Sequence, residues 1–135
     1  ATDVTGYGFL GHLNEMIQAT NSMRRKENLK DIKVVLNLNS FKAYSGVINL
    51  INKGIKSSLF EENNKILDSL RFKSHERIID FIYGNNMNPE EGKIIKKLLC
   101  DPQTCGPILI SCNEKFEKYF DNNWYKVGIV DNKNN

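Results

Sequence analysis

Residues 1–13 read ATDVTGYGFLGHL and combine a single carboxylate, a glycine-rich turn and the start of an apolar helix. Gly6, Gly8 and Gly11 have the Gly-x-Gly-x-x-Gly spacing that is found in dinucleotide-binding turns. Such a turn follows a buried strand, and an acidic residue ends the next strand. Here only five residues precede Gly6, and the next strand pattern ends in NLN (37–39) without an acid. We therefore do not expect nicotinamide or flavin binding.

The carboxylate of Asp3 lies just upstream of this turn. Free amides at a helix N-terminus attract phosphate, whereas a nearby carboxylate repels it unless a cation lies between the two. Mg²⁺ suits that place, because it takes one or two carboxylates and completes its shell with phosphate oxygens and water. Asp3 is thus the candidate metal residue, with Mg²⁺ as the expected cofactor. The structural alternative is a helix cap whose glycines serve close packing.

The spacing of apolar residues predicts alternating helices and strands. Helices are expected from Gly8 to residues 21–22, from a Ser40 cap to Gly54, within 66–83 around Ile78, Ile79 and Ile82, from Asn88-Pro89 through Leu99, and briefly after Asn113. Strands are expected at 32–38, 108–111 and 124–130, a loop at 55–65, and a frayed tail at 131–135. This order predicts an α+β (mixed α/β) domain in which helices cover one sheet.

Composition excludes several classes of protein. At 135 residues the chain suits one domain, and no apolar stretch is long enough to span a membrane. The net charge is +3 and the basic residues are scattered, so no nucleic-acid partner is expected. The longest basic run, residues 24–26, suits the C-terminal end of a helix.

Three cysteines without a secretory signal predict reduced thiols and a cytoplasmic protein. Cys100, Cys105 and Cys112 lack the spacing of a zinc site, so we expect buried or half-buried thiols. His12 and His75 are distant from these cysteines in sequence. His12, one turn into a helix, is expected to pack or cap rather than to catalyse.

Two stretches together resemble a known family. ATDVTGYGFLGHL resembles the TDVTGFGLLGH segment of selenophosphate synthetases (selenide, water dikinases), and LLCDPQTCGPILI (98–110) resembles their LLxDPQTSGGLLI segment. The match is specific at both stretches, extends to VGIV (127–130), and is poor through the middle.

The resemblance implies that residues 1–135 form a single C-terminal domain of a larger enzyme. The implied fold is that of the aminoimidazole ribonucleotide synthetase-like superfamily, partly ferredoxin-like. These enzymes are transferases that make selenophosphate from selenide and ATP with Mg²⁺, releasing AMP and phosphate, and they are homodimers. The resemblance assigns Asp3 to the metal at the ATP phosphates, and it places the catalytic Cys or selenocysteine in an N-terminal domain. The 135 residues alone are therefore expected to be inactive, with no catalytic residue of their own.

The chain departs from the family pattern at Cys105-Gly106-Pro107, where the family has Ser-Gly-Gly. Pro107 lacks an N–H, which is tolerable at the first residue of a strand but removes any substrate contact of that amide. Cys105 has no cationic neighbour in sequence, so a neutral thiol is expected. Tyr7 replaces the usual Phe and adds a hydroxyl that needs a partner or solvent.

Two other functions stay open at this point. One is a related ATP-dependent enzyme, such as a thiamine monophosphate kinase-like or hydrogenase-maturation protein, although the DPQT segment favours the selenium enzyme. The other is a non-catalytic paralogue with a role in assembly or regulation, which the altered residues 105–107 would suit.

Overall fold

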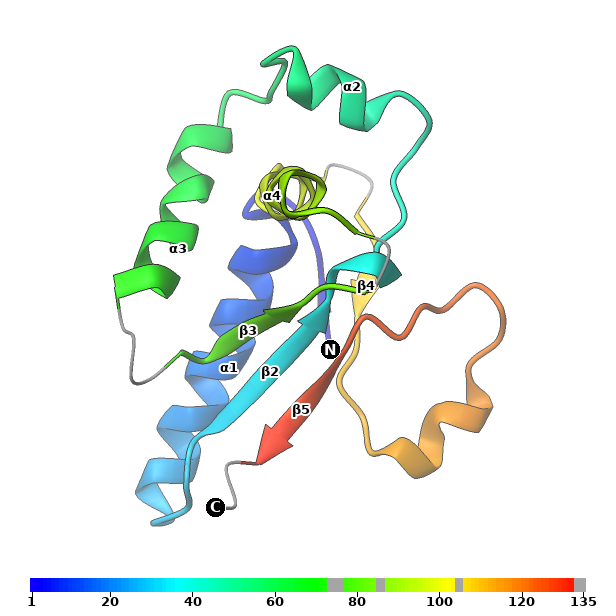
Figure 1. The fold of residues 1–135 in the computed structure, drawn as a ribbon. Helices are drawn as coiled ribbons and strands as arrows, with labels where there is room; N and C mark the ends of the chain where they lie inside the picture. The colour runs from blue at the N-terminus through cyan, green and yellow to red at the C-terminus, as the bar shows by residue number, and fades with distance from the viewer. Residues whose placement is uncertain (73–76, 85–86, 104–105, 133–135) are drawn as a thin grey trace.

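The computed structural model describes residues 1–72, 77–84, 87–103 and 106–132, and its elements follow one another as Figure 1 shows. In chain order they are β1 (Thr2–Asp3), α1 (Gly8–Lys26), β2 (Ile32–Asn37), a 3₁₀ turn (Leu38–Ser40), α2 (Val47–Asn52), α3 (Phe60–Phe72), β3 (Ile79–Ile82), α4 (Pro89–Leu98), β4 (Ile108–Leu109), a second 3₁₀ turn (Glu114–Tyr119) and β5 (Gly128–Asn132). The predicted mixed α+β class is confirmed.

The described strands form two sheets, so the prediction of one sheet was wrong. The larger sheet has the order β3-β2-β5, with β2 parallel to β3 and antiparallel to β5. The smaller sheet pairs β1 with β4, two residues each, in antiparallel register. Pro107, just before β4, has no N–H with which to extend a ladder. Its carbonyl instead accepts the N–H of Val4, which joins β4 to the N-terminal strand.

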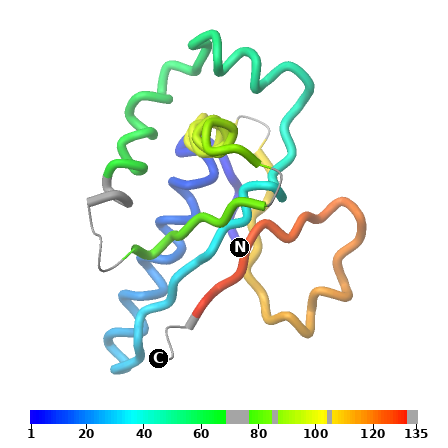
Figure 2. The backbone as a smooth tube through the Cα atoms, in the orientation of Figure 1, coloured from blue at the N-terminus to red at the C-terminus, as the bar shows by residue number. Residues whose placement is uncertain are grey.

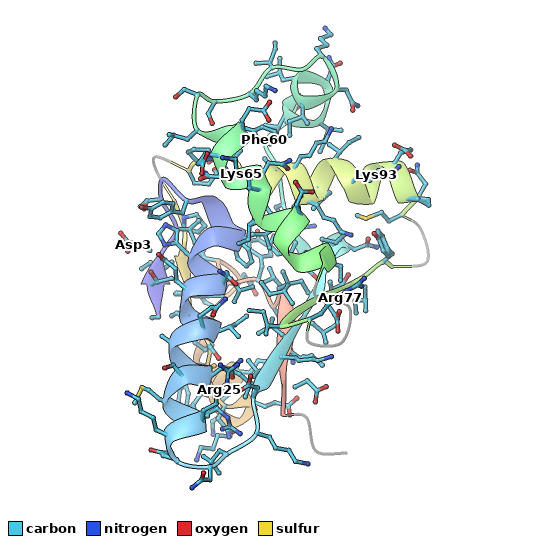
Figure 3. All side chains as sticks on the ribbon, turned by 90° about the vertical axis from the view of Figure 1, so that its left-hand side faces the viewer. Asp3, Arg25, Phe60, Lys65, Arg77 and Lys93 are labelled. Atoms are coloured by element: carbon cyan, nitrogen blue, oxygen red, sulfur yellow. The ribbon has the colours of Figure 1, made fainter. Side chains whose placement is uncertain are left out.

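Helix α1 covers one face of the larger sheet, and Figures 1 and 3 show no described helix over the opposite face. The side chains toward α1 are apolar, and Val34 and Leu36 of β2 and Ile79 of β3 are almost completely buried. The predicted alternation along 32–38 is therefore confirmed. The opposite face is more polar, and Lys33 of β2 forms an ion pair with Asp80 of β3 there at 3.7 Å.

Helix α1 continues to Lys26, one turn beyond the predicted end. The side chain of Asn21 is buried, and it donates to the carbonyl of Ile32 and accepts the N–H of Ile32. A polar residue at this position therefore links the helix to β2 instead of stopping the helix. The basic run at 24–26 does lie in the last turn, as predicted.

The helix predicted from a Ser40 cap was wrong at its start. Ser40 ends the 3₁₀ turn, and α2 begins only at Val47 after Gly46, whose φ is +89°. Phe41 instead lies in extended backbone, and its ring packs edge-on against Phe9 of α1 with centroids 4.9 Å apart. Gly54 follows the end of α2 with a φ of +78°, as the predicted stop requires.

Residues 55–83 differ most from the prediction. Residues 60–65, predicted as loop, begin α3, where Phe60 is buried. Ile79 and Ile82, predicted on a helix, begin and end β3 instead. Three isoleucines at 78, 79 and 82 fit helical spacing, but β-branched residues also suit a strand, and pairing with β2 decides between the two.

The C-terminal half is closer to the prediction. Asn88 caps α4 with a complete capping box to Glu91, and Asn113 caps the second 3₁₀ turn, both as predicted. Strand β5 begins at Gly128 rather than at residue 124, and it includes 131–132, which were predicted to fray. The remaining tail, 133–135, lies outside the described residues. Figure 2 shows the segment 110–127 projecting from the body of the domain.

No helix in the described part of the chain is long and apolar enough to cross a membrane.

Replacing Asn21 with Ala should lower the free energy of unfolding by about 2 kcal/mol, because it leaves both backbone groups of Ile32 without their partner in a buried place. Urea denaturation measures this change. The exposed Gln18→Ala on the same helix is the control and should change stability by less than about 0.5 kcal/mol. Equal effects of the two variants would contradict the role given to Asn21.

Candidate functional site

The two stretches that resemble one family lie side by side in the structure, although residues 14–97 lie between them in sequence. The N–H of Val4 donates to the carbonyl of Pro107 at 2.9 Å, and the N–H of Gln103 donates to the carbonyl of Thr5 at 3.0 Å. Thr2 and Asp3 pair with Leu109 and Ile108 in the same ladder. These contacts define the candidate site, which consists of the turn 3–8 and residues 99–103 and 106–107.

Two glycines allow the backbones at this site to approach closely. A Cβ on Gly106 would lie 1.3 Å from the carbonyl oxygen of Val4. Gly8 has a φ of +66°, and a Cβ there would lie 2.7 Å from the carbonyl group of Cys100. Both positions therefore require glycine for packing. Pro107 contributes its carbonyl to this contact, so the missing N–H does not weaken the link to Val4.

The first amides of α1 are partly used inside the protein. The N–H of Gly8 donates to Thr5, and the N–H of Leu10 donates to the carbonyl of Leu99 at the end of α4. Within the described residues, the N–H groups of Gly6 and Tyr7 have no acceptor. The N–H groups that could bind an anion at this helix entry therefore include those of the turn before the helix.

Asp3 is exposed, and Figure 3 shows its side chain at the outer edge of the molecule. No hydrogen bond or ion pair to its carboxylate is found in the described part of the chain. Among these residues, no group of three His, Cys, Asp or Glu side chains is close enough to hold a metal ion. Asp3 is thus free to supply one oxygen ligand to Mg²⁺, and the remaining ligands would have to be phosphate oxygens, water or other groups.

His12 packs against the turn, as predicted. Its Nε2 lies 3.2 Å from the hydroxyl of Thr5, and its Nδ1 lies 3.4 Å from a carboxylate oxygen of Glu15. The ring also meets Tyr7 edge-on, with centroids 5.6 Å apart. The Tyr7 side chain is 62% exposed, so solvent reaches its hydroxyl. His12 therefore supports the turn from the side of α1, while His75 lies outside the described residues.

Two side chains from the poorly matching middle of the chain also contact the site. Asn63 of α3 donates to the carbonyls of Gly6 and Cys100, at 2.8 and 3.0 Å. Ser57, just before α3, donates its hydroxyl and N–H to the Asp101 carboxylate. Sequence reasoning missed both residues, because 55–65 was predicted to be a loop and no role was assigned to it. Their polar side chains carry no pattern that would have identified them.

The cysteines divide between two environments. Cys100 is completely buried, and burial, with a further contribution from the neighbouring Asp101 charge, raises its thiol pKa to about 12. Cys112 is exposed, so the prediction of a buried or half-buried thiol was wrong there. The reason is its place on the projecting segment 110–127, which packs little against the body. Cys105 lies outside the described residues.

The fold and site together define a mixed α+β domain with a glycine-rich turn beside a free carboxylate. No protein-family model matches the chain. Among curated proteins it is similar to selenide, water dikinases. It is 34% identical over 114 residues to that of Campylobacter jejuni strain RM1221, and 30% identical over 110 residues to that of Haemophilus ducreyi. It is also 30% identical over 128 residues to that of Escherichia coli O139:H28.

These matches cover 84%, 82% and 95% of this chain. The chain spans about a quarter of the length of the curated relatives, from 24% to 29% of each. The resemblance inferred from the two stretches is thus confirmed: the chain is similar in sequence to part of the selenide, water dikinases.

Gly106→Ala should lower the free energy of unfolding by about 3 kcal/mol or more, because the new methyl group would overlap the Val4 carbonyl and separate β1 from β4. Gly6→Ala is the matched control, since its Cβ would meet no atom within 4 Å. Thermal or urea unfolding of the two variants checks this. Equal stability of the two would contradict the close packing described here.

Cys100 should react with iodoacetamide at pH 8 at least about 100-fold more slowly than Cys112 in the folded chain, because a pKa near 12 leaves almost no thiolate. Peptide mass spectrometry resolves the two sites, and unfolding in urea should make their rates similar. The neutral thiol of Cys100 stabilises the fold fully below pH 9, its ordinary pKa, and this stabilisation is lost as the pH rises toward 12. Equal labelling in the folded state would contradict this account.

Proposed function

We propose that this chain is the C-terminal domain of a selenide, water dikinase, in which Asp3 contributes one ligand to the Mg²⁺ that accompanies the ATP phosphates. The observation that carries the proposal is the pairing of residues 3–5 with Gln103, Pro107 and Ile108, because it joins the two stretches that resemble the family into one site. The similarity to three named dikinases over most of this chain supports the same conclusion.

The chemistry of Asp3 suits this role. Its carboxylate is exposed and unpaired in the described structure, so it can bind a cation without first breaking an ion pair. Mg²⁺, when bound, neutralises the charge of the phosphate groups and holds them in position. The free N–H groups of Gly6 and Tyr7 add donors suitable for a phosphate oxygen next to that carboxylate.

One carboxylate is too few protein ligands for a self-sufficient site. The catalytic nucleophile and the other metal carboxylates would therefore come from the remaining three quarters of the parent enzyme. Since phosphoryl transfer depends on positioning and charge neutralisation, this part alone should have no dikinase activity. We further propose that the parent enzyme is a cytoplasmic homodimer that takes ATP and selenide as substrates.

A chimaera tests the proposal, with this chain in place of the matching quarter of the Campylobacter jejuni dikinase. We expect selenide-dependent AMP formation from the chimaera, and a loss of about 100-fold or more with Asp3→Asn, because one ligand of the phosphate-bound metal is removed. Asp131→Asn, an exposed carboxylate on the larger sheet, is the charge-matched control and should keep full activity.

An active chimaera in which Asp3→Asn has no effect would contradict the role of Asp3. Selenide-dependent AMP formation by the 135 residues alone would contradict the divided site. Release of AMP or ADP with another acceptor, and none with selenide, would favour a different enzyme of the same superfamily.

A further inference from the structure

We propose that Asn63 is a positioning residue for the turn that follows Asp3, and that it holds this turn in the conformation that the phosphate site needs. This inference rests on the proposed function only in taking the turn after Asp3 to be part of a phosphate site. The contacts themselves are those of the described chain, and they come from helix α3, which lies between the two stretches that resemble the family.

The amide group of Asn63 uses both of its hydrogens on the two halves of the site. Nδ2 lies 2.8 Å from the carbonyl oxygen of Gly6 and 3.0 Å from that of Cys100. A side-chain amide has two N–H donors, so one residue satisfies both carbonyls. The turn before α1 and the segment after α4 are thereby held at a fixed separation.

The bond to Gly6 also fixes the direction of a neighbouring donor. The carbonyl of Gly6 and the N–H of Tyr7 belong to one planar trans peptide unit, so they point in opposite directions. Because the carbonyl points toward α3, the Tyr7 N–H points away from α3. This N–H has no acceptor in the described part of the chain, and the Tyr7 side chain is exposed. Asn63 thus holds the Tyr7 N–H pointing away from α3, in the turn that follows Asp3.

Helix α3 is suited to act as a rigid support. Phe60, one turn before Asn63, is buried in the hydrophobic core. Ser57, just before the helix, binds the carboxylate of Asp101 and so ties the same end of α3 to the segment 99–103. A helix whose N-terminal end is anchored in this way can position a turn that contains two glycines and has little stiffness of its own.

The test compares Asn63→Leu and Asn63→Asp, which keep the size of the side chain but remove its donors, with Asn21→Ala. The control variant breaks a buried asparagine link of the same kind between α1 and β2, away from the turn. All are measured as the full 135-residue chain, at a temperature at which each is folded by circular dichroism.

Two measurements are made by NMR. Amide hydrogen exchange should become about tenfold faster at Gly8 and Leu10 in the Asn63 variants, because the turn and its contact with Leu99 loosen, while Val34 in β2 stays protected. In Asn21→Ala, exchange should instead become faster at Val34, while Gly8 and Leu10 stay protected. Line broadening by Mn²⁺ with inorganic tripolyphosphate then reports binding near residues 3–7, which should weaken about tenfold in both Asn63 variants and not in Asn21→Ala.

Unchanged exchange at Gly8 and Leu10 would overturn the proposal, as would unchanged Mn²⁺–tripolyphosphate affinity in the Asn63 variants. Absence of Asp3-dependent binding by the wild-type chain would agree with one carboxylate being too few ligands for a site, and the metal role of Asp3 is then decided by the chimaera. The exchange pattern then decides the positioning role by itself. The two failures are therefore distinguishable.

Discussion

The structure depends on the backbone pairing of the first five residues with Gln103 and with residues 107–109. The N–H of Val4 binds Pro107, and the N–H of Gln103 binds Thr5, so the N-terminal strand and the segment after α4 are fixed to each other. This pairing sets where α1 begins, and α1 in turn covers the larger sheet. The carbonyl of Leu99, at the end of α4, accepts the N–H of Leu10 in α1. The negative end of one helix dipole thus faces the positive end of another, which favours the same arrangement.

This backbone pairing explains why glycine is needed at these positions, which a dinucleotide-binding motif does not. Gly8 and Gly106 are required because backbone atoms of Cys100 and Val4 occupy the space of a side chain. Gly6 has open space around it, and its contribution lies in a peptide unit whose carbonyl points inward. The same motif therefore has two purposes, close packing at Gly8 and donor presentation at the turn, and the structural and functional interpretations of the sequence do not exclude one another.

The sequence predicted the elements whose local signals agree with their tertiary contacts. Asn88 and Pro89 begin α4, and residues 32–37 form a strand with one buried face, because caps and alternation are local properties. The prediction from sequence was wrong where tertiary contacts decide the secondary structure. Ile79 and Ile82 belong to a strand because β2 lies beside them, and α3 begins at Phe60 because that ring enters the core. For the site, Asp3 could be inferred from the sequence, whereas Asn63 could not, since its partners are backbone carbonyls that no side-chain pattern reveals.

The different roles proposed for Asp3 and Asn63 follow from the physical chemistry of a carboxylate and an amide. A carboxylate that binds a metal must remain free of other partners, and Asp3 is exposed at the edge of a two-residue strand. A group that positions the site must be held firmly, and Asn63 lies on a helix that is fixed by Phe60 in the core and by Ser57 at its start. The proposed metal ligand therefore lies in a stretch that resembles the family, and its proposed support comes from the middle of the chain. Any polar side chain that binds the same two carbonyls can provide this support, so the middle of the chain can diverge in sequence while the geometry of the turn is retained.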